Sequence, residues 1–218
     1  MAITIRSGGS AQAQNRYRAS VTQVLADVRR TQTGRLVLEF LNAAPFDVVI
    51  EPNLQAGGFD NAFERPASRV HGGNARLGTS ARGTRSMVQF SPNRLSGRGV
   101  QFQPHEVLLH ELCHSLRSVT GSSRYDGSGN DRAIAGNFTS VEEFFAAMVT
   151  SVHSSELGRP ALGNHGQWAL PSVDRLRKRP FNTRLREFNQ SMPRFCERLR
   201  AIPAVVAPFN PFRDIAAP

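Results

Sequence analysis

Several residue types are scarce in this chain, and each scarcity excludes a class of protein. The two cysteines, Cys113 and Cys196, are too few for a disulfide framework. No apolar run approaches the roughly 20 residues that a membrane-spanning helix requires. The N-terminal residues also lack the apolar block of a cleavable secretory signal. The sequence therefore predicts a protein without a disulfide framework, a membrane span or a cleavable signal peptide.

Positive charge comes almost entirely from arginine, because Lys178 is the single lysine beside 26 arginines. The formal net charge of +10 suggests binding to nucleic acid. The charge is unevenly placed, however: residues 1–100 carry 13 basic and 6 acidic residues, and residues 171–218 carry 10 and 4. Residues 101–170 carry 4 basic and 7 acidic residues. We therefore assign the positive charge to a scaffold or a docking surface rather than to a reactive site.

The pattern along the chain predicts one domain of mixed secondary structure. Residues 1–19 are polar, and we expect a disordered leader there, followed by a single domain over residues 20–218. Hydrophobic spacing and breaker residues predict helices and strands within that domain. The expected helices cover residues 20–30, 35–44, 104–119 and 141–158, and the expected strands cover 46–52 and 85–92. Loops and short ribbons are expected over 57–86, and a partly helical basic tail follows Pro171.

The stretch PHEVLLHELCHSL contains an HExxH motif. Four residues of helix turn about 400° and rise about 6 Å, so His110 and His114 project from one face and can share a metal ion. Glu111 is then held beside the metal, where it suits a general base. His105 is turned away from this pair, and we expect it to be exposed. Cys113 is expected to pack as a small apolar residue.

A catalytic zinc site of this kind needs a third protein ligand. The long metzincin motif would place a glycine and a histidine where this chain has Arg117 and Thr120, so that motif is excluded. The remaining candidates are acidic residues on nearby elements. They are Asp126, Asp131, Glu142, Glu143 and Glu156.

The helix that begins near Val141 favours Glu143 among these acids. Glu142 is accounted for as the acid of a capping box opened by Thr139. Glu143 shares its helix face with small residues, which allow this helix to approach the HExxH helix closely. Those small residues are Ala146, Ala147 and Thr150.

These motifs resemble those of known zinc peptidases. EFFA after an HExxH is similar to the zinc-ligand helix of anthrax lethal factor, where the liganding glutamate immediately precedes FFA. More broadly, RYDGSG, EEFFA and SELGRPALGNHG resemble the NleD-like family of bacterial effector zinc metallopeptidases. The family's asparagine after Ser-Glu is Leu157 here, and a second glutamate of lethal factor is Ala147. The positions that match the family are Arg124-Tyr125, Glu142-Glu143, Glu156 and His165-Gly166.

The motif and the resemblance together predict an α+β, zincin-like fold. It would have a small twisted sheet, an HExxH helix and a following helix that bears the glutamate. We expect a zinc-dependent endopeptidase, a bacterial effector or toxin that is secreted or injected and cleaves a protein or peptide substrate in a target cell. Tyr125 and His165 are candidates to stabilise the oxyanion or fix the substrate. The strand MVQFSP is expected to be the sheet edge on which an extended substrate lies.

Two alternatives rest on the basic flanks of the chain. One is a DNA-associated zinc protease, and the other is a basic nucleic-acid-binding protein with a structural metal. Glu111 argues against the second, because a structural site needs no base and is usually closed by a fourth protein ligand. We therefore do not expect nucleic acid as the partner.

Overall fold

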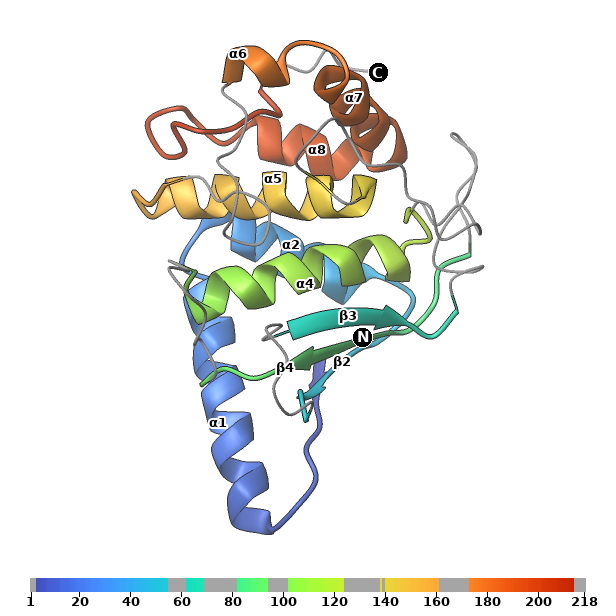
Figure 1. The fold of residues 1–218 in the computed structure, drawn as a ribbon, viewed down its shortest axis with the longest axis vertical. Helices are drawn as coiled ribbons and strands as arrows, with labels where there is room; N and C mark the ends of the chain where they lie inside the picture. The colour runs from blue at the N-terminus through green and yellow to red at the C-terminus, as the bar shows by residue number, and fades with distance from the viewer. Residues whose placement is uncertain are drawn as a thin grey trace.

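The computed structural model describes residues 3–54, 62–68, 82–93, 102–123, 138, 140–160 and 173–213. Within them the fold is α+β, as predicted, with a four-stranded sheet beside stacked helices (Figure 1). The elements in chain order are β1 (Ile3–Ile5), α1 (Ala11–Val28), α2 (Gln32–Ala43), β2 (Val48–Pro52), β3 (Ala62–Pro66), β4 (Ser86–Phe90), α4 (Pro104–Val119), α5 (Val141–Glu156), α6 (Val173–Leu176), α7 (Phe181–Ser191) and α8 (Pro193–Arg200).

The sheet has the strand order β1-β2-β4-β3. The first three strands in this order run parallel, and β3 pairs antiparallel with β4. Alternate residues of β2 and β4 are buried, as expected for a sheet with one covered face. The prediction that MVQFSP forms the sheet edge is wrong, because β4 is hydrogen-bonded on both sides. The edge beside it is β3, which falls in the region predicted to be loops and ribbons.

Helix α4 lies between the sheet and α5 (Figure 1). Helix α2 contacts both α4 and α5, while α7 and α8 cover the far side of α5 and α2. This central position explains why residues 111–119 of α4 are all buried. The HExxH motif therefore lies on a helix held by packing on several sides.

Helix α4 also has the ends that the sequence predicted. Pro104 occupies its first turn, where the missing N–H costs nothing. The helix ends at Val119, and Gly121 follows with a φ of 69°, the left-handed conformation typical after a helix end.

The prediction of a disordered leader over residues 1–19 is wrong for the residues described. Strand β1 pairs with β2, and α1 begins at Ala11 behind Ser10, whose side chain accepts a hydrogen bond from the Ala13 N–H. Residues 11–19 are mostly exposed and are rich in Gln, Asn and Arg, which is why their composition suggested disorder. The buried face of α1 lies further along, at Val21, Val24, Leu25 and Val28. Packing of that face stabilises α1, and the Ser10 cap stabilises the exposed N-terminal turns of the same helix.

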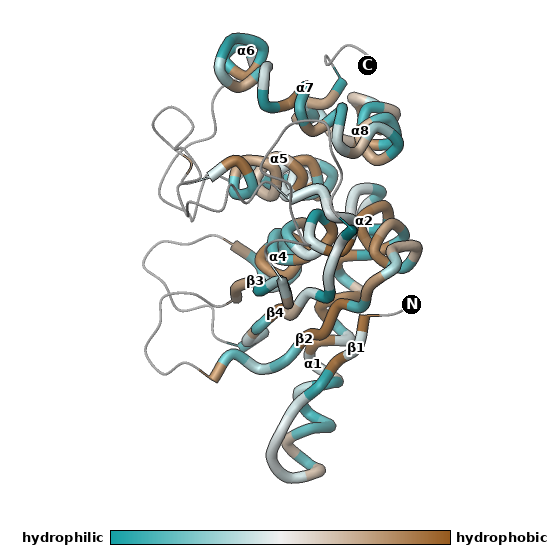
Figure 2. Tube along the Cα trace, turned by 90° about the vertical axis from the view of Figure 1, so that its right-hand side faces the viewer, coloured by the Kyte–Doolittle hydropathy of each residue, from teal (hydrophilic) through white to brown (hydrophobic). Residues whose placement is uncertain are grey.

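The hydropathy pattern agrees with this arrangement. Figure 2 shows hydrophobic residues along β1, β2 and α2, while the outer end of α1 is mostly hydrophilic. In the described part of the chain, no helix combines the length and apolar character needed to cross a membrane.

Candidate metal centre

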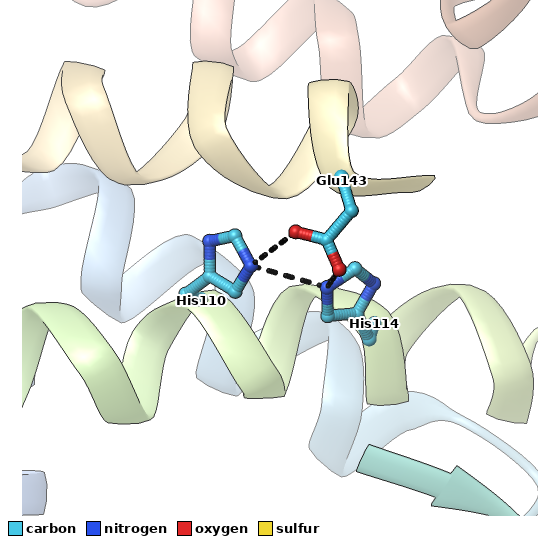
Figure 3. Close-up of side chains that lie close together, drawn as sticks. All are labelled: His110, His114 and Glu143. Carbon is cyan, nitrogen blue, oxygen red and sulfur yellow. Dashed lines mark hydrogen bonds and ion pairs between the residues drawn. The ribbon is translucent and has the colours of Figure 1, made fainter. Parts of the chain in front are cut away.

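The two histidines of the HExxH motif lie one turn apart on α4 and face the same side. Their Nε2 atoms are 3.2 Å apart, and the rings meet edge to face (Figure 3). His110 is half-buried and His114 is buried. The helical spacing of the motif thus brings both nitrogens to one point, as predicted.

Helix α5 brings Glu143 to the same point. Its Oε2 lies 3.1 Å from Nε2 of His110, and its Oε1 lies 3.4 Å from Nε2 of His114 (Figure 3). The backbone N–H of Glu143 donates to the Ser140 side chain at 3.0 Å, so the residue belongs to the first, capped turn of α5. Ligand atoms of the three residues all lie within 4.8 Å of one another.

These separations can be tested against a tetrahedral metal. Ligand atoms about 2.0–2.1 Å from a zinc ion in tetrahedral geometry lie about 3.3 Å from each other. The two Nε2 atoms are 3.2 Å apart, and the shortest contacts of Glu143, 3.1 Å from Oε2 to His110 and 3.4 Å from Oε1 to His114, are also near that value, each through a different carboxylate oxygen. Among the described residues, this cluster of possible metal ligands has three members, which offer two imidazole nitrogens and one carboxylate. The donor set and its spacing therefore fit zinc with one coordination position left open.

The electrostatic surroundings favour a cation. Burial opposes the charged form of His114, but the carboxylates of Glu143, Glu111 and Glu64 outweigh it and raise the pKa of His114 to about 10. Three carboxylates therefore act on one buried imidazole. A divalent cation at this point would neutralise charge that the protein otherwise has to balance with protons.

Glu64 was missed by the sequence reasoning. It lies on β3, where its Oε1 accepts a hydrogen bond from Ser86 Oγ at 2.6 Å. Burial raises the pKa of its carboxyl group, while Ser86, His114 and Ser118 oppose that change. Nothing in the sequence marked this residue, because β3 lies in a stretch predicted as loops and ribbons. Only the pairing of β3 with β4 brings Glu64 beside the HExxH helix.

The assignment of Glu142 to a capping box is wrong. The N-cap of α5 is Ser140, and Thr139 lies outside the described residues. Glu142 is buried and pairs with the buried Arg117, at 2.5 Å to Nε and 2.9 Å to Nη2. Sequence spacing could not reveal this pair, since it joins two helices across a 25-residue separation.

Glu156, another candidate ligand, has a structural role. Its carboxylate accepts hydrogen bonds from the backbone N–H groups of Gln32 and Thr33, at 2.6 and 2.8 Å. These groups belong to the first turn of α2, where unsatisfied donors attract an anion. Glu156 therefore joins the end of α5 to the start of α2.

The expectation that His105 is exposed is wrong. It is half-buried, and its Nδ1 lies 2.9 Å from Nε2 of His153, whose Nδ1 lies 2.6 Å from Thr31 Oγ1. Burial, with smaller contributions from His105 and Arg159, lowers the pKa of His153 to about 3. These contacts give His153 a structural role. The free Cys113 is buried, as predicted.

The remaining predicted site residues lie outside the described part of the chain. They are Tyr125 and His165, the two candidates for oxyanion stabilisation, and the alternative ligands Asp126 and Asp131.

The fold and the site define an α+β protein in which an HExxH helix and the next helix converge on a His-His-Glu group. The family model Peptidase_M91, described as an effector protein, matches residues 6–151, about two thirds of the chain. The chain therefore belongs to this family of effector peptidases, the NleD-like family that its motifs resemble. Comparison with curated proteins gives no match.

Proposed function

We propose that this protein is a zinc-dependent endopeptidase, delivered as a bacterial effector, that cleaves a protein inside a target cell. The observation that supports this most directly is the convergence of His110, His114 and Glu143 at spacings of 3.1–3.4 Å. Membership of an effector peptidase family supports a protein substrate and delivery into another cell.

His110, His114 and Glu143 would hold the zinc ion, and Glu111 would act as general base. When bound, zinc would polarise the scissile carbonyl and lower the pKa of water. Glu111 would remove the proton from the attacking water and donate it to the amine nitrogen as the C–N bond breaks. Glu111 is buried beside His110 on α4, which supports this role.

Tyr125 and His165 are proposed to stabilise the oxyanion or to hold the substrate. Replacing Tyr125 with Phe removes only the hydroxyl. If that hydroxyl donates to the oxyanion, kcat should fall about 100-fold while KM and zinc content stay nearly constant. An unchanged kcat would remove Tyr125 from the site.

Metal content and cleavage together test the main assignment. His110→Ala and His114→Ala should lose zinc, whereas Glu111→Ala should keep zinc and lose activity. Substrates can be found by incubating the protein with candidate cell lysates and mapping new N-termini, with Glu111→Ala as the control. A folded Glu111→Ala protein without zinc would contradict the assignment of Glu111 as a base rather than a metal ligand.

The DNA-associated alternatives have only the basic flanks in their support. A binding assay over a range of salt concentrations separates them, because phosphate contacts make affinity fall steeply with salt. We expect weak binding without sequence preference. Tight DNA binding that stimulates proteolysis would favour a DNA-associated protease instead.

A further inference from the structure

Arg117 is a buried arginine whose contacts extend beyond its own helix. Its guanidinium pairs with Glu142 of α5 through Nε and Nη2. Nη2 also donates to the Ser122 carbonyl at 2.5 Å, and Nη1 donates to Ser191 Oγ of α7 at 3.3 Å. The group is therefore held by α5, by α7 and by the turn after α4.

Two aromatic rings complete the surroundings of this guanidinium. The central carbon of Arg117 lies 4.9 Å from the ring centre of Phe145 and 5.0 Å from that of Phe188. Contact with ring faces favours a cation. A charge buried with this many partners is costly to displace, because each lost contact leaves a desolvated group.

The pair lies next to the candidate metal ligands on both helices. Arg117 follows His114 by three residues, about 4.5 Å along α4. Glu142 immediately precedes Glu143, so the two carboxylates leave α5 about 100° apart. One carboxylate engages Arg117 while the other faces His110 and His114 (Figure 3).

A small rotation of α5 would separate Glu143 from the histidines. Side chains reach about 5–6 Å from a helix axis, so a rotation of about 10° moves a carboxylate by about 1 Å. Metal–ligand distances tolerate only about 0.2 Å. The site therefore needs a device that fixes the rotation of α5 against α4, and a bidentate ion pair one residue from the ligand meets that need.

We propose that Arg117 and Glu142 are positioning residues that hold Glu143 in register with His110 and His114. This rests on the proposed function, since it assigns the pair a role toward the metal ligands. Outer residues that orient ligands are typically worth about 10–100-fold in metal affinity. Loss of the pair should therefore weaken metal binding even though neither residue is a ligand.

The experiment uses Co²⁺ as a probe, because its absorption spectrum reports coordination geometry while zinc is silent. Wild type, Arg117→Met and Glu142→Gln are titrated with Co²⁺ against a competing chelator. A double variant, Arg117→Met with Glu142→Leu, removes both charges and leaves none unpaired. Val152→Ala is the matched control, since Val152 is buried on α5 nine residues beyond Glu143.

We expect a loss of about 10-fold or more in Co²⁺ affinity in all three pair variants, with a changed spectrum. Val152→Ala should lose stability and keep affinity within about twofold of wild type, because its defect lies far from the ligands. Folding of the single variants is checked by circular dichroism. The double variant keeps the test decisive if they unfold.

Two results would overturn the proposal. One is a folded pair variant, single or double, with wild-type affinity and spectrum. The other is an equal loss in Val152→Ala, which would show that general stability accounts for the effect. Failure of the metal site itself is distinguishable, because wild type would then bind Co²⁺ weakly and Glu143→Gln would make no difference.

Discussion

Adjacent glutamates of α5 have different roles because helical neighbours point about 100° apart. Glu143 faces the histidines, while Glu142 pairs with Arg117 in the interior. A glutamate in a capping box tolerates replacement by glutamine, because both residues serve in that motif. The buried ion pair changes that expectation.

Glu143→Gln should weaken zinc binding by about 100-fold or more, because it removes the negative charge of a ligand. Replacing a residue that only orients a ligand typically costs about 10–100-fold, and loss of the ligand charge should cost at least as much. Glu142→Gln should cost about 10-fold in affinity and about 3 kcal/mol in stability, because Arg117 loses its buried counter-charge. Chelator competition and urea unfolding measure the two effects. Earlier release of zinc by Glu142→Gln would mean that the faces of α5 are assigned wrongly.

His153 should make the folded state sensitive to acid. Its pKa is lowered to about 3, whereas a free histidine titrates near 6.5. As the pH falls below about 6.5, the unfolded chain binds a proton that the folded chain does not, so the stability present above that pH is lost. The free energy of unfolding should drop by about 2 kcal/mol between pH 6.5 and 5 through this group.

Urea unfolding of metal-free protein at those two pH values measures the effect. His153→Gln keeps hydrogen-bonding groups but cannot bind the proton. Between pH 6.5 and 5, the free energy of unfolding of this variant should therefore fall by about 2 kcal/mol less than that of wild type. If the variant and wild type show the same pH dependence, His153 is not the group responsible.

At the scale of elements, α4 and α5 run antiparallel and are joined at both ends. Arg117 and Glu142 link one end, and Glu106 of α4 accepts from Ser154 of α5 at 2.8 Å near the other. The candidate metal ligands lie between these links. The two helices therefore behave as one unit whose register sets the site.

The segment that leads into β4 also approaches the end of α4 closely. Gly83 has a φ of 87°, and a Cβ there would lie 2.3 Å from the Val119 carbonyl oxygen. Gly83→Ala should therefore destabilise the protein by about 2–4 kcal/mol, from backbone strain plus the clash.

Gly158 provides the control for this prediction. Its φ is 68°, but a Cβ there meets no atom within 4 Å, so Gly158→Ala should cost only about 1 kcal/mol. Urea unfolding compares the two variants. Equal costs would show that the close approach to α4 has no energetic consequence.

At the scale of the whole molecule, helices α6–α8 lie beyond the matched family range and form a layer on the side of α5 away from α4 (Figure 1). Exposed basic residues cluster at its start, at Arg175, Arg177, Lys178 and Arg179. We expect this surface to steer an acidic partner toward the protein.

Replacing Arg175, Arg177 and Arg179 with Gln should leave cleavage of a short neutral peptide unchanged. Cleavage of a whole acidic protein should slow several-fold at low salt, and the difference should shrink at high salt, because long-range attraction is screened. Steady-state kinetics on both substrates test this. A large loss of kcat on the short peptide would instead show that these helices shape the site.

The sequence by itself determined the local features of this protein. Helical periodicity and end signals located α4, and the four-residue spacing of the histidines placed both on one face, since both depend only on neighbouring residues. The choice of Glu143 followed from the small residues on its helix face. Its spacing to the histidines agrees with that choice.

Only the tertiary structure decided the roles that depend on distant partners. Three contacts join residues that are far apart in the sequence: Glu142 with Arg117, Glu64 with Ser86, and Glu156 with the first turn of α2. Whether β3 is an edge strand, and whether residues 3–19 form a strand and a helix, likewise depends on which elements lie beside them. A single sequence states which groups can ionise or pair, but the packing of elements decides which groups meet, because burial makes an unpaired charge too costly to leave.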